Sequence, residues 1–288
     1  MSEQLVESDG SVPAGQRFGD YLVTGVLGEG GVGTVYRAVD DAGREVALKV
    51  VKAALADDMT FRRRFTREAR IVQTIEHEHV VAVLAAGEQD GTPYMVQQLI
   101  SGGTLAERIE REGRLDLVTT VRVCRQVASG LDALHAARVV HRDVKPANIL
   151  LDEPTVETPV HAYIADFGLV KPHDGTLLTA AGQALGTIDY IAPEQIRAEE
   201  VTPATDVYAL GCVVYACLVG SPPFADRRGM KILWAHLQDP PVNPASRVPD
   251  IPADVGHAVL MALEKDPMRR PQSAGMFGQL LRLGSRLE

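Results

Sequence analysis

The spacing of hydrophobic positions divides the chain into a strand-rich first part and a helix-rich second part. Short β-prone runs, separated by turns rich in glycine and aspartate, are predicted at residues 21–27, 34–39, 45–50, 80–85 and 94–100. Between the third and fourth runs, apolar residues recur every three or four positions from Phe61 to Ile75, which predicts one helix over residues 53–76.

After the break at Ser101-Gly-Gly the pattern becomes helical. Helices are predicted at residues 104–112, 117–137, 203–220, 228–237, 253–263 and 274–283. The order of elements indicates an α+β fold with two lobes, a small β-rich one with a single main helix and a larger α-helical one. The expected boundaries are a disordered leader at residues 1–16, lobes at 17–100 and 101–283, and a tail at 284–288.

Composition narrows the function classes. Apolar residues make up 45% of the 288 residues and charged residues 23%, as in soluble globular proteins. The net charge of −9 argues against a general nucleic-acid binder, because phosphate contacts need a basic surface. The N-terminus carries no apolar signal-peptide core, and the most apolar run, residues 207–220, is shorter than the roughly 20 residues of a membrane span. We therefore expect a cytoplasmic chain with no membrane span, although it can still be part of a longer membrane-anchored protein.

Cys124, Cys212 and Cys217 lie in apolar helical stretches. They lack the paired spacing of a zinc site and are too few for a disulfide framework. Buried, reduced thiols are the expected state.

A glycine-rich run, GEGGVG, extends from Gly28 to Gly33. A dinucleotide site would require this run to open a helix, but the residues that follow continue as a strand. The run is therefore predicted to be a β-hairpin, either a plain glycine-rich turn or a loop whose backbone N–H groups cover phosphates. No Gly-Lys-Ser/Thr follows, which excludes a Walker A loop.

Lys49 lies in an otherwise apolar strand, where its charge needs a partner. Glu68, on the following helix, is the natural counter-ion, and the pair would hold the lysine against anionic phosphate oxygens. The alternative is an edge lysine that reaches solvent.

The segment HRDVKPAN, residues 141–148, concentrates one carboxylate, two cations and an amide in one loop. Asp166, in the sequence DFG, ends the strand-like run that follows it. A second carboxylate near the amide of Asn148 is an oxygen donor set suited to Mg²⁺, whose shell is completed by phosphates and water.

Together with Ala192-Pro-Glu194, these motifs resemble, in order, the signature set of eukaryotic-type protein kinases. The resemblance covers about residues 17–283 and is strongest to bacterial Hanks-type serine/threonine kinases. It implies a bilobal kinase fold and an ATP-dependent protein kinase that phosphorylates Ser/Thr hydroxyls of proteins, including itself, in signalling.

The resemblance also implies roles for individual residues. Asp143 would be the catalytic base, with Lys145 near the γ-phosphate and Lys49 on the α- and β-phosphates, paired to Glu68. Asn148 and Asp166 would hold Mg²⁺, or Mn²⁺ as a substitute. The residues implied for ATP binding are Leu27, Gly28, Glu29, Gly30, Gly31, Val32, Gly33, Val35, Ala47, Lys49, Gln97, Gln98, Ile100 and Leu150.

The substrate class and the regulation follow from the same resemblance. Lys145 is typical of serine/threonine kinases, and Thr187 belongs to the expected peptide platform. Arg142 is expected to bind a phosphate on the activation loop, with Thr179 as the first candidate phosphosite and Thr176 as the second. The resemblance leaves open whether the chain forms a homodimer for trans-autophosphorylation.

Three further matches are interpreted as structural. Asp206 is expected to accept backbone N–H groups of the catalytic loop, and Glu194 is expected to form a buried ion pair with Arg270. His141, despite its residue type, is interpreted as a packing residue, in a stack with Val72, Val83 and Phe167.

The sequence departs from the family in two places. Gln97 and Gln98 stand where a larger apolar gatekeeper and a glutamate are usual, which leaves backbone recognition of adenine in place. The spacing from Asn148 to Asp166 is about five residues longer than usual, which predicts an extended hairpin loop.

Two other functions were weighed. A small-molecule phosphotransferase would be expected to lack the Ala-Pro-Glu platform and its arginine. A non-catalytic scaffold would be expected to lose Lys49, Asp143 or Asp166, and all three are present.

Overall fold

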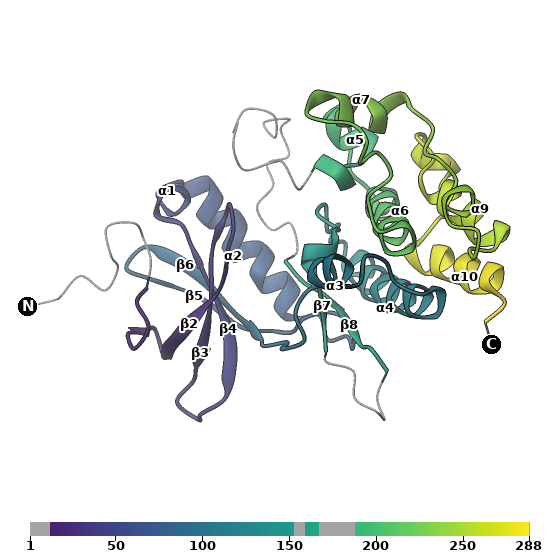
Figure 1. Ribbon diagram of the computed structural model, residues 1–288. Helices are drawn as coiled ribbons and strands as arrows, with labels where there is room; N and C mark the ends of the chain where they lie inside the picture. The colour runs from purple at the N-terminus through teal and green to yellow at the C-terminus, as the bar shows by residue number, and fades with distance from the viewer. Residues whose placement is uncertain (1–11, 153–158, 167–187, 288) are drawn as a thin grey trace, which may run out of the picture. The chain divides into compact units, whose positions relative to one another are not determined.

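The computed structural model of the protein describes residues 12–152, 159–166 and 188–287, which form two compact units. The first unit comprises the described residues up to Glu76 together with Val81–Leu99. The second comprises His77–Val80 and the described residues from Ile100 onward. In Figure 1 the first unit carries the purple and blue sheet, and the second carries the teal to yellow helices.

The first unit is built on one antiparallel sheet of six strands in the order β1-β2-β3-β4-β6-β5. The strands are β1 (Arg17–Phe18), β2 (Tyr21–Glu29), β3 (Gly33–Val39), β4 (Glu45–Val51), β5 (Val83–Gln89) and β6 (Thr92–Gln98). Alternate residues of β3 and β4, among them Tyr36 and Leu48, form an apolar core with Phe18 and Val96. Because successive side chains of a strand point to opposite faces, the residues between these positions lie on the other face of β3 and β4, away from this core.

This unit begins earlier than the predicted boundary at residue 17. Val12 is only 2% exposed, and its N–H donates to the Tyr36 hydroxyl at 2.9 Å. The expectation of a disordered leader is therefore not met at this residue, and residues 1–11 lie outside the described chain.

The single helix predicted over residues 53–76 is two helices, α1 (Ala53–Ala56) and α2 (Met59–Gln73). The carboxylate of Asp58 accepts the backbone N–H groups of Thr60 at 2.8 Å and Phe61 at 3.3 Å. An aspartate in this position caps a new helix, so the chain leaves helical geometry just before it. The predicted buried face of α2 is confirmed by Phe61, Phe65, Ala69 and Val72, and the helix packs on β5 and β6.

Two strands are displaced from their predicted positions. The run predicted at residues 80–85 pairs in the sheet only from Val83, because Val80 is itself part of the second unit and forms an isolated bridge with Ile164 there. The run predicted at residues 94–100 begins at Thr92 and ends at Gln98. A short apolar run shows that a segment is buried, but not which partner it pairs with.

The second unit consists mainly of helices. They are α3 (Leu105–Glu112), α4 (Leu117–Ala136), α5 (Pro193–Ile196), α6 (Pro203–Val219), α7 (Met230–Gln238), α8 (Pro244–Arg247), α9 (Ala253–Ala262) and α10 (Ala274–Ser285). Among the described residues, the unit also contains the short 3₁₀ helices η1 (Pro146–Asn148), η3 (Ile188–Tyr190) and η4 (Pro267–Arg269) and the hairpin of β7 (Ile149–Leu151) and β8 (Ala162–Ile164). The one-turn helices α5 and α8 were not predicted, because four residues carry no periodicity.

Helix α6 lies at the centre of this unit, against α4, α9 and α10 (Figure 1). Nearly all its residues are buried, which confirms the prediction of a core helix for residues 207–220. Cys124, Cys212 and Cys217 are buried free thiols, and burial raises the pKa of each, that of Cys217 to about 12. Among the described residues, no helix is long and apolar enough to cross a membrane.

Candidate active site

The glycine-rich run forms the tip of the β2–β3 hairpin, as predicted. Strand β2 ends at Glu29, β3 begins at Gly33, and the Gly30 N–H donates to the Gly33 carbonyl at 2.9 Å. Gly33 is required by close approach, because an added Cβ would lie 2.2 Å from the carbonyl oxygen of Val50 on β4. The tip is therefore a tight strand connection and does not open a helix.

Strand register places four of the predicted nucleotide-binding residues on one face of the sheet. Val35 pairs with Lys49, and Ala47 pairs with Gln97. Directly paired residues, and residues two apart in a strand, point to the same side. This face is opposite to the apolar core that contains Tyr36 and Leu48.

The other predicted residues of the first unit occupy several positions. Leu27 is exposed on β2, and Glu68 is partly buried on α2. Gln98 is exposed at the end of β6, and its N–H donates to the Ala82 carbonyl at 2.9 Å. Its backbone N–H is therefore already paired within the first unit. The Lys49–Glu68 pairing stays a prediction.

In the second unit, the predicted catalytic residues converge on Asp143. Lys145 Nζ lies 3.0 Å from Asp143 Oδ2, and Asn148 Nδ2 donates to the same oxygen at 3.1 Å and to the Asp143 carbonyl at 2.8 Å. Pro146 begins the short helix η1, whose turn brings Asn148 back toward Asp143. One ammonium and one amide therefore both contact the same carboxylate.

Asp206, at the start of α6, holds this loop as predicted. Its buried carboxylate accepts the backbone N–H groups of His141 and Arg142, both at 2.8 Å. Arg142 has a positive φ of 65°, a strained conformation for a residue with a Cβ, and the two hydrogen bonds help to hold it. The backbone that presents Asp143 is fixed by the protein core.

His141 is a packing residue in the structure. It is fully buried, its Nε2 donates to the Ala165 carbonyl at 2.9 Å, and its Nδ1 accepts the Asp143 N–H at 3.3 Å. Burial lowers its pKa, so the neutral ring with the proton on Nε2 is the stable form. Both nitrogens serve the backbone of the site and neither is presented to a substrate.

The two predicted metal ligands lie beside each other through β-pairing. The Ala165 N–H donates to the Asn148 carbonyl at 2.9 Å, and Asp166 follows directly, with a positive φ of 54°. Because Asn148 Nδ2 is bound to Asp143, its side-chain oxygen is the atom left for a cation. An amide oxygen and a carboxylate are donors that fit Mg²⁺. No group of three or more His, Cys, Asp or Glu residues in the described chain has the arrangement of a metal site.

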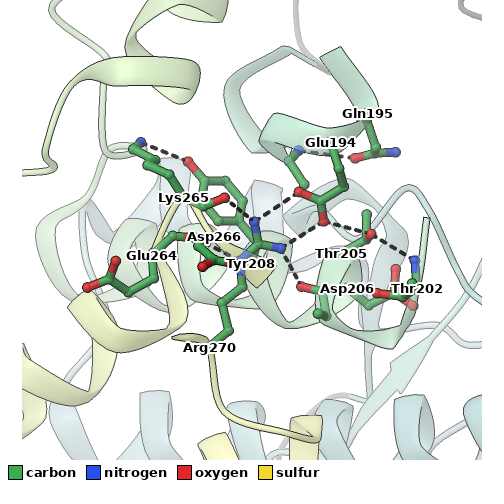
Figure 2. Close-up of polar contacts among 12 residues, drawn as sticks. Glu194, Gln195, Thr202, Thr205, Asp206, Tyr208, Glu264, Lys265, Asp266 and Arg270 are labelled. Carbon is green, nitrogen blue, oxygen red and sulfur yellow. Dashed lines mark hydrogen bonds and ion pairs between the residues drawn. The ribbon is translucent and has the colours of Figure 1, made fainter. Parts of the chain in front are cut away.

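The predicted ion pair between Glu194 and Arg270 is confirmed (Figure 2). The guanidinium donates to both carboxylate oxygens, at 2.7 and 2.9 Å, and both side chains are almost fully buried. Thr205 donates a further bond to the carboxylate at 2.8 Å. Burial alone would raise the pKa of Glu194, but the hydrogen bonds and charge of Arg270 outweigh it and lower the net pKa.

Two polar residues of this region were not predicted. Gln195 Nε2 donates to the Arg142 carbonyl at 2.9 Å, which joins α5 to the catalytic loop. His135 Nε2 donates to Asp206 at 2.7 Å. Neither belongs to one of the quoted motifs, and only their helical positions beside Glu194 and before the loop are visible in the sequence.

Four of the predicted residues lie outside the part of the chain that the structure describes. They are Thr176, Thr179, Thr187 and Phe167, so the loop phosphosites, the peptide platform and the full side-chain stack stay predictions. Ile100 is buried and Leu150 partly buried, both in the second unit. The predicted β7–β8 hairpin is present, and residues 153–158 of its long connection are outside the description.

Comparison with known proteins decides the family. Residues 21–279 match the protein kinase domain family. The chain belongs to this family. It is 38% identical over 262 residues to the serine/threonine-protein kinase PknE and 37% identical over 270 residues to PknD, both of Mycobacterium tuberculosis.

These matches cover 91% and 93% of this kinase chain but only 45% and 40% of the relatives, so the chain spans less than half the length of the proteins it resembles. Among solved structures, the kinase domain of M. tuberculosis PknI is similar, with a TM-score of 0.76 and 26% sequence identity. That match covers 95% of this chain and all of the PknI domain. The fold is that of a protein kinase.

Proposed function

We propose that this chain is an ATP-dependent serine/threonine protein kinase that phosphorylates other proteins and itself. The observation that carries the proposal is the contact of Asp143 with Lys145 and Asn148 on a loop held by Asp206. The relatives named serine/threonine-protein kinases support the substrate class.

Asp143 would act on the incoming hydroxyl. The substrate oxygen attacks the γ-phosphorus, the bond from phosphorus to the oxygen of ADP breaks, and the hydroxyl proton passes to the Asp143 carboxylate. Lys145, 3.0 Å from that carboxylate, adds positive charge where the transferred phosphoryl group is negative. The residues act mainly by position and charge.

The first unit would bind the nucleotide. Val35 and Ala47 offer an apolar surface beside Lys49 on the same sheet face, which suits an adenine ring next to a phosphate-binding cation. The backbone of the glycine-rich hairpin and of Gln98 would contribute hydrogen bonds. Glu68 would orient Lys49.

Asn148 and Asp166 would hold Mg²⁺, with Mn²⁺ as a substitute. The metal would supply neutralisation of phosphate charge. Two protein ligands agree with the preference of Mg²⁺ for a shell made largely of phosphate and water oxygens.

Regulation would act through Arg142 and a phosphate on Thr179, or secondarily Thr176, with Thr187 in the peptide platform. We further propose that a homodimer carries out trans-autophosphorylation, and that the chain works in the cytoplasm, alone or as the cytosolic part of a longer membrane-anchored protein. The greater length of the relatives is compatible with the second arrangement.

The buried Glu194–Arg270 pair favours a protein kinase over a small-molecule phosphotransferase. It ties the segment that begins at Ala192-Pro-Glu194 to the region before α10, which is the support expected beneath a peptide platform. The presence of Lys49, Asp143 and Asp166 argues against a non-catalytic scaffold.

The proposal is tested by incubation with γ-labelled ATP and Mg²⁺, followed by phosphoamino-acid analysis of the labelled chain. Label on serine and threonine is expected, and Lys49→Met should abolish it while leaving the circular-dichroism spectrum unchanged. Label on tyrosine alone, or equal labelling of the Lys49→Met chain, would overturn the proposal.

A further inference from the structure

The side chain of Gln195 bridges helix α5 to the catalytic loop. Gln195 is the third residue of α5, and Figure 2 shows it beside Glu194. Its side-chain oxygen accepts the N–H of Ala192, the residue before the helix, at 3.1 Å, and its Nε2 donates to the carbonyl of Arg142 at 2.9 Å. A backbone N–H can only donate and a carbonyl can only accept, so these two neighbours also fix which end of the amide faces Arg142.

The bond to Arg142 holds the peptide group that carries Asp143. The carbonyl of Arg142 and the N–H of Asp143 belong to the same planar peptide group. Gln195 donates to its carbonyl, and Nδ1 of His141 accepts its N–H at 3.3 Å. The side chain of Asp143 leaves the backbone directly after this plane. A rotation of the plane would therefore turn the carboxylate.

The backbone just before this plane is strained. Arg142 has a φ of 65°, a conformation that is unfavourable for a residue with a Cβ. The carboxylate of Asp206 accepts the N–H of Arg142 at 2.8 Å, on the far side of the Arg142 Cα from the plane. Rotation about the bond from that Cα to the carbonyl carbon is restricted by the hydrogen bond from Gln195.

Gln195 itself is held by the core of the second unit. Glu194, the residue before it, receives two hydrogen bonds from the guanidinium of Arg270, at 2.7 and 2.9 Å. The carboxylate at the other end of the bridge, that of Asp143, lies 3.0 Å from the ammonium of Lys145. A displacement of about 1 Å in a reacting group can reduce the rate of a reaction about 100-fold. The anchored glutamine is therefore well placed to affect the rate.

We propose that Gln195 is a positioning residue for phosphate transfer, which orients the Asp143 carboxylate by holding the carbonyl of Arg142. The proposal rests on the kinase function proposed above. Both bonds of the Gln195 side chain described here are made within the second unit, to the backbone of α5 and of the catalytic loop. Its effect is therefore on the rate of transfer and not on the affinity for ATP.

The test compares the wild-type chain with Gln195→Met and Gln195→Glu. Methionine has a similar size but makes neither bond, whereas an ionised glutamate keeps the acceptor for Ala192 and has no proton for the Arg142 carbonyl. Transfer from γ-labelled ATP with Mg²⁺, to dephosphorylated casein and to the chain itself, is measured over a range of ATP concentrations. Both variants should lower kcat by about 10- to 100-fold and leave KM for ATP within about twofold of wild type.

The pH profile of Gln195→Glu is a readout that a purely structural role would not change. A protonated glutamic acid regains a donor for the Arg142 carbonyl. The ratio of its kcat to that of wild type should therefore rise as pH falls toward the pKa of the new carboxyl group, about 4.3 or higher beside a carbonyl. The ratio cancels the titration of acids that both chains share there, Asp143, Glu194 and Asp206. For Gln195→Met the ratio should not change with pH.

Gln126→Met is the matched control. Gln126, on α4, makes the same kind of bridge, because its side-chain oxygen accepts the N–H of Ala162 at 2.9 Å and its Nε2 donates to the carbonyl of Val160 at 3.4 Å. Both glutamines are partly buried, so the two methionine variants should lower the melting temperature by similar amounts. The bridge from Gln126 does not reach the catalytic loop, and Gln126→Met should retain the wild-type kcat.

The outcomes separate this inference from the function beneath it. If the wild-type chain transfers phosphate neither to casein nor to itself, the proposed function fails. The positioning role of Gln195 is overturned, and the kinase function stands, if either folded Gln195 variant keeps kcat within about twofold of wild type or changes only KM for ATP. A loss of kcat no larger than that of Gln126→Met, or a Gln195→Glu ratio that does not rise in acid, would overturn it as well. Gln195→Glu keeps the size and polarity of the side chain, so the test does not depend on Gln195→Met folding.

Discussion

Replacing Arg270 with methionine should unfold the second unit at a markedly lower temperature. The guanidinium donates to both oxygens of Glu194 and to the carbonyls of Ala204, Glu264 and Lys265, and none of its side chain is exposed. Without it, the hydroxyl of Thr205 is the one side chain of the described residues that still donates to the Glu194 carboxylate.

The magnitude follows from the burial of the pair. Removing one partner of a buried ion pair costs about 3–5 kcal/mol, because the remaining charge is desolvated without compensation. For a unit of this size, each kcal/mol lowers the melting temperature by about 2–4 °C, which predicts a decrease of about 6–20 °C. Arg269→Met is the matched control, because its ion pair with Glu264 is long, at 3.8 Å, and exposed, and should contribute at most about 1 kcal/mol.

Circular dichroism melts at several pH values measure this difference. The folded pKa of Glu194 is lowered from 4.5, so its contribution is complete above that pH and is lost as pH falls through the folded pKa. The gap between wild type and Arg270→Met should therefore be widest at neutral pH and narrow in acid. The double variant Glu194→Leu/Arg270→Met should be more stable than Arg270→Met, because no charge is left alone. A decrease no larger than that of Arg269→Met would refute the reasoning.

Three further results are expected. Burial lowers the pKa of Lys265 to about 8, so its ε-methylene group should titrate near that value by NMR, and a midpoint near 10.5 would contradict its burial. Between pH 8 and 10.5 only the folded chain loses this proton, so the free energy of unfolding should rise across that range. The three buried thiols should react slowly with a thiol reagent in native protein and fully in denaturant, whereas rapid native reaction would show that α4 and α6 are more accessible than described. Asp58→Ala should lower the free energy of unfolding of the first unit by about 1 kcal/mol in urea titrations, because two backbone N–H groups lose their acceptor. An effect no greater than that of Asp57→Ala would contradict the role of Asp58 as a helix cap.

The parts of the fold that the sequence predicted well are those with a long periodic signal or a dense motif. The apolar run in α6 is long enough to indicate a buried helix, and the roles of Asp206 and Glu194 came from the family resemblance and are confirmed by short contacts. The predicted bounds of an element were wrong where a tertiary contact determines them. Val80 is apolar and β-prone, but it belongs to the second unit and its partner there is Ile164, so β5 begins three residues later.

The candidate site shows the same limit. The residue types around Asp143 are visible in the sequence, but the contacts that hold them are not, as with the hydrogen bond from Gln195 to Arg142.

The most direct test of the central claim is phosphate transfer by Asp143→Asn. The amide keeps the size of the side chain but cannot accept the hydroxyl proton, so transfer from labelled ATP should fall by about 100- to 10,000-fold. The melting temperature should stay close to that of wild type. The control Asp250→Asn, which removes the charge of a side chain that is 86% exposed, should retain the wild-type rate. Transfer by a folded Asp143→Asn chain at a rate within tenfold of wild type would contradict the account.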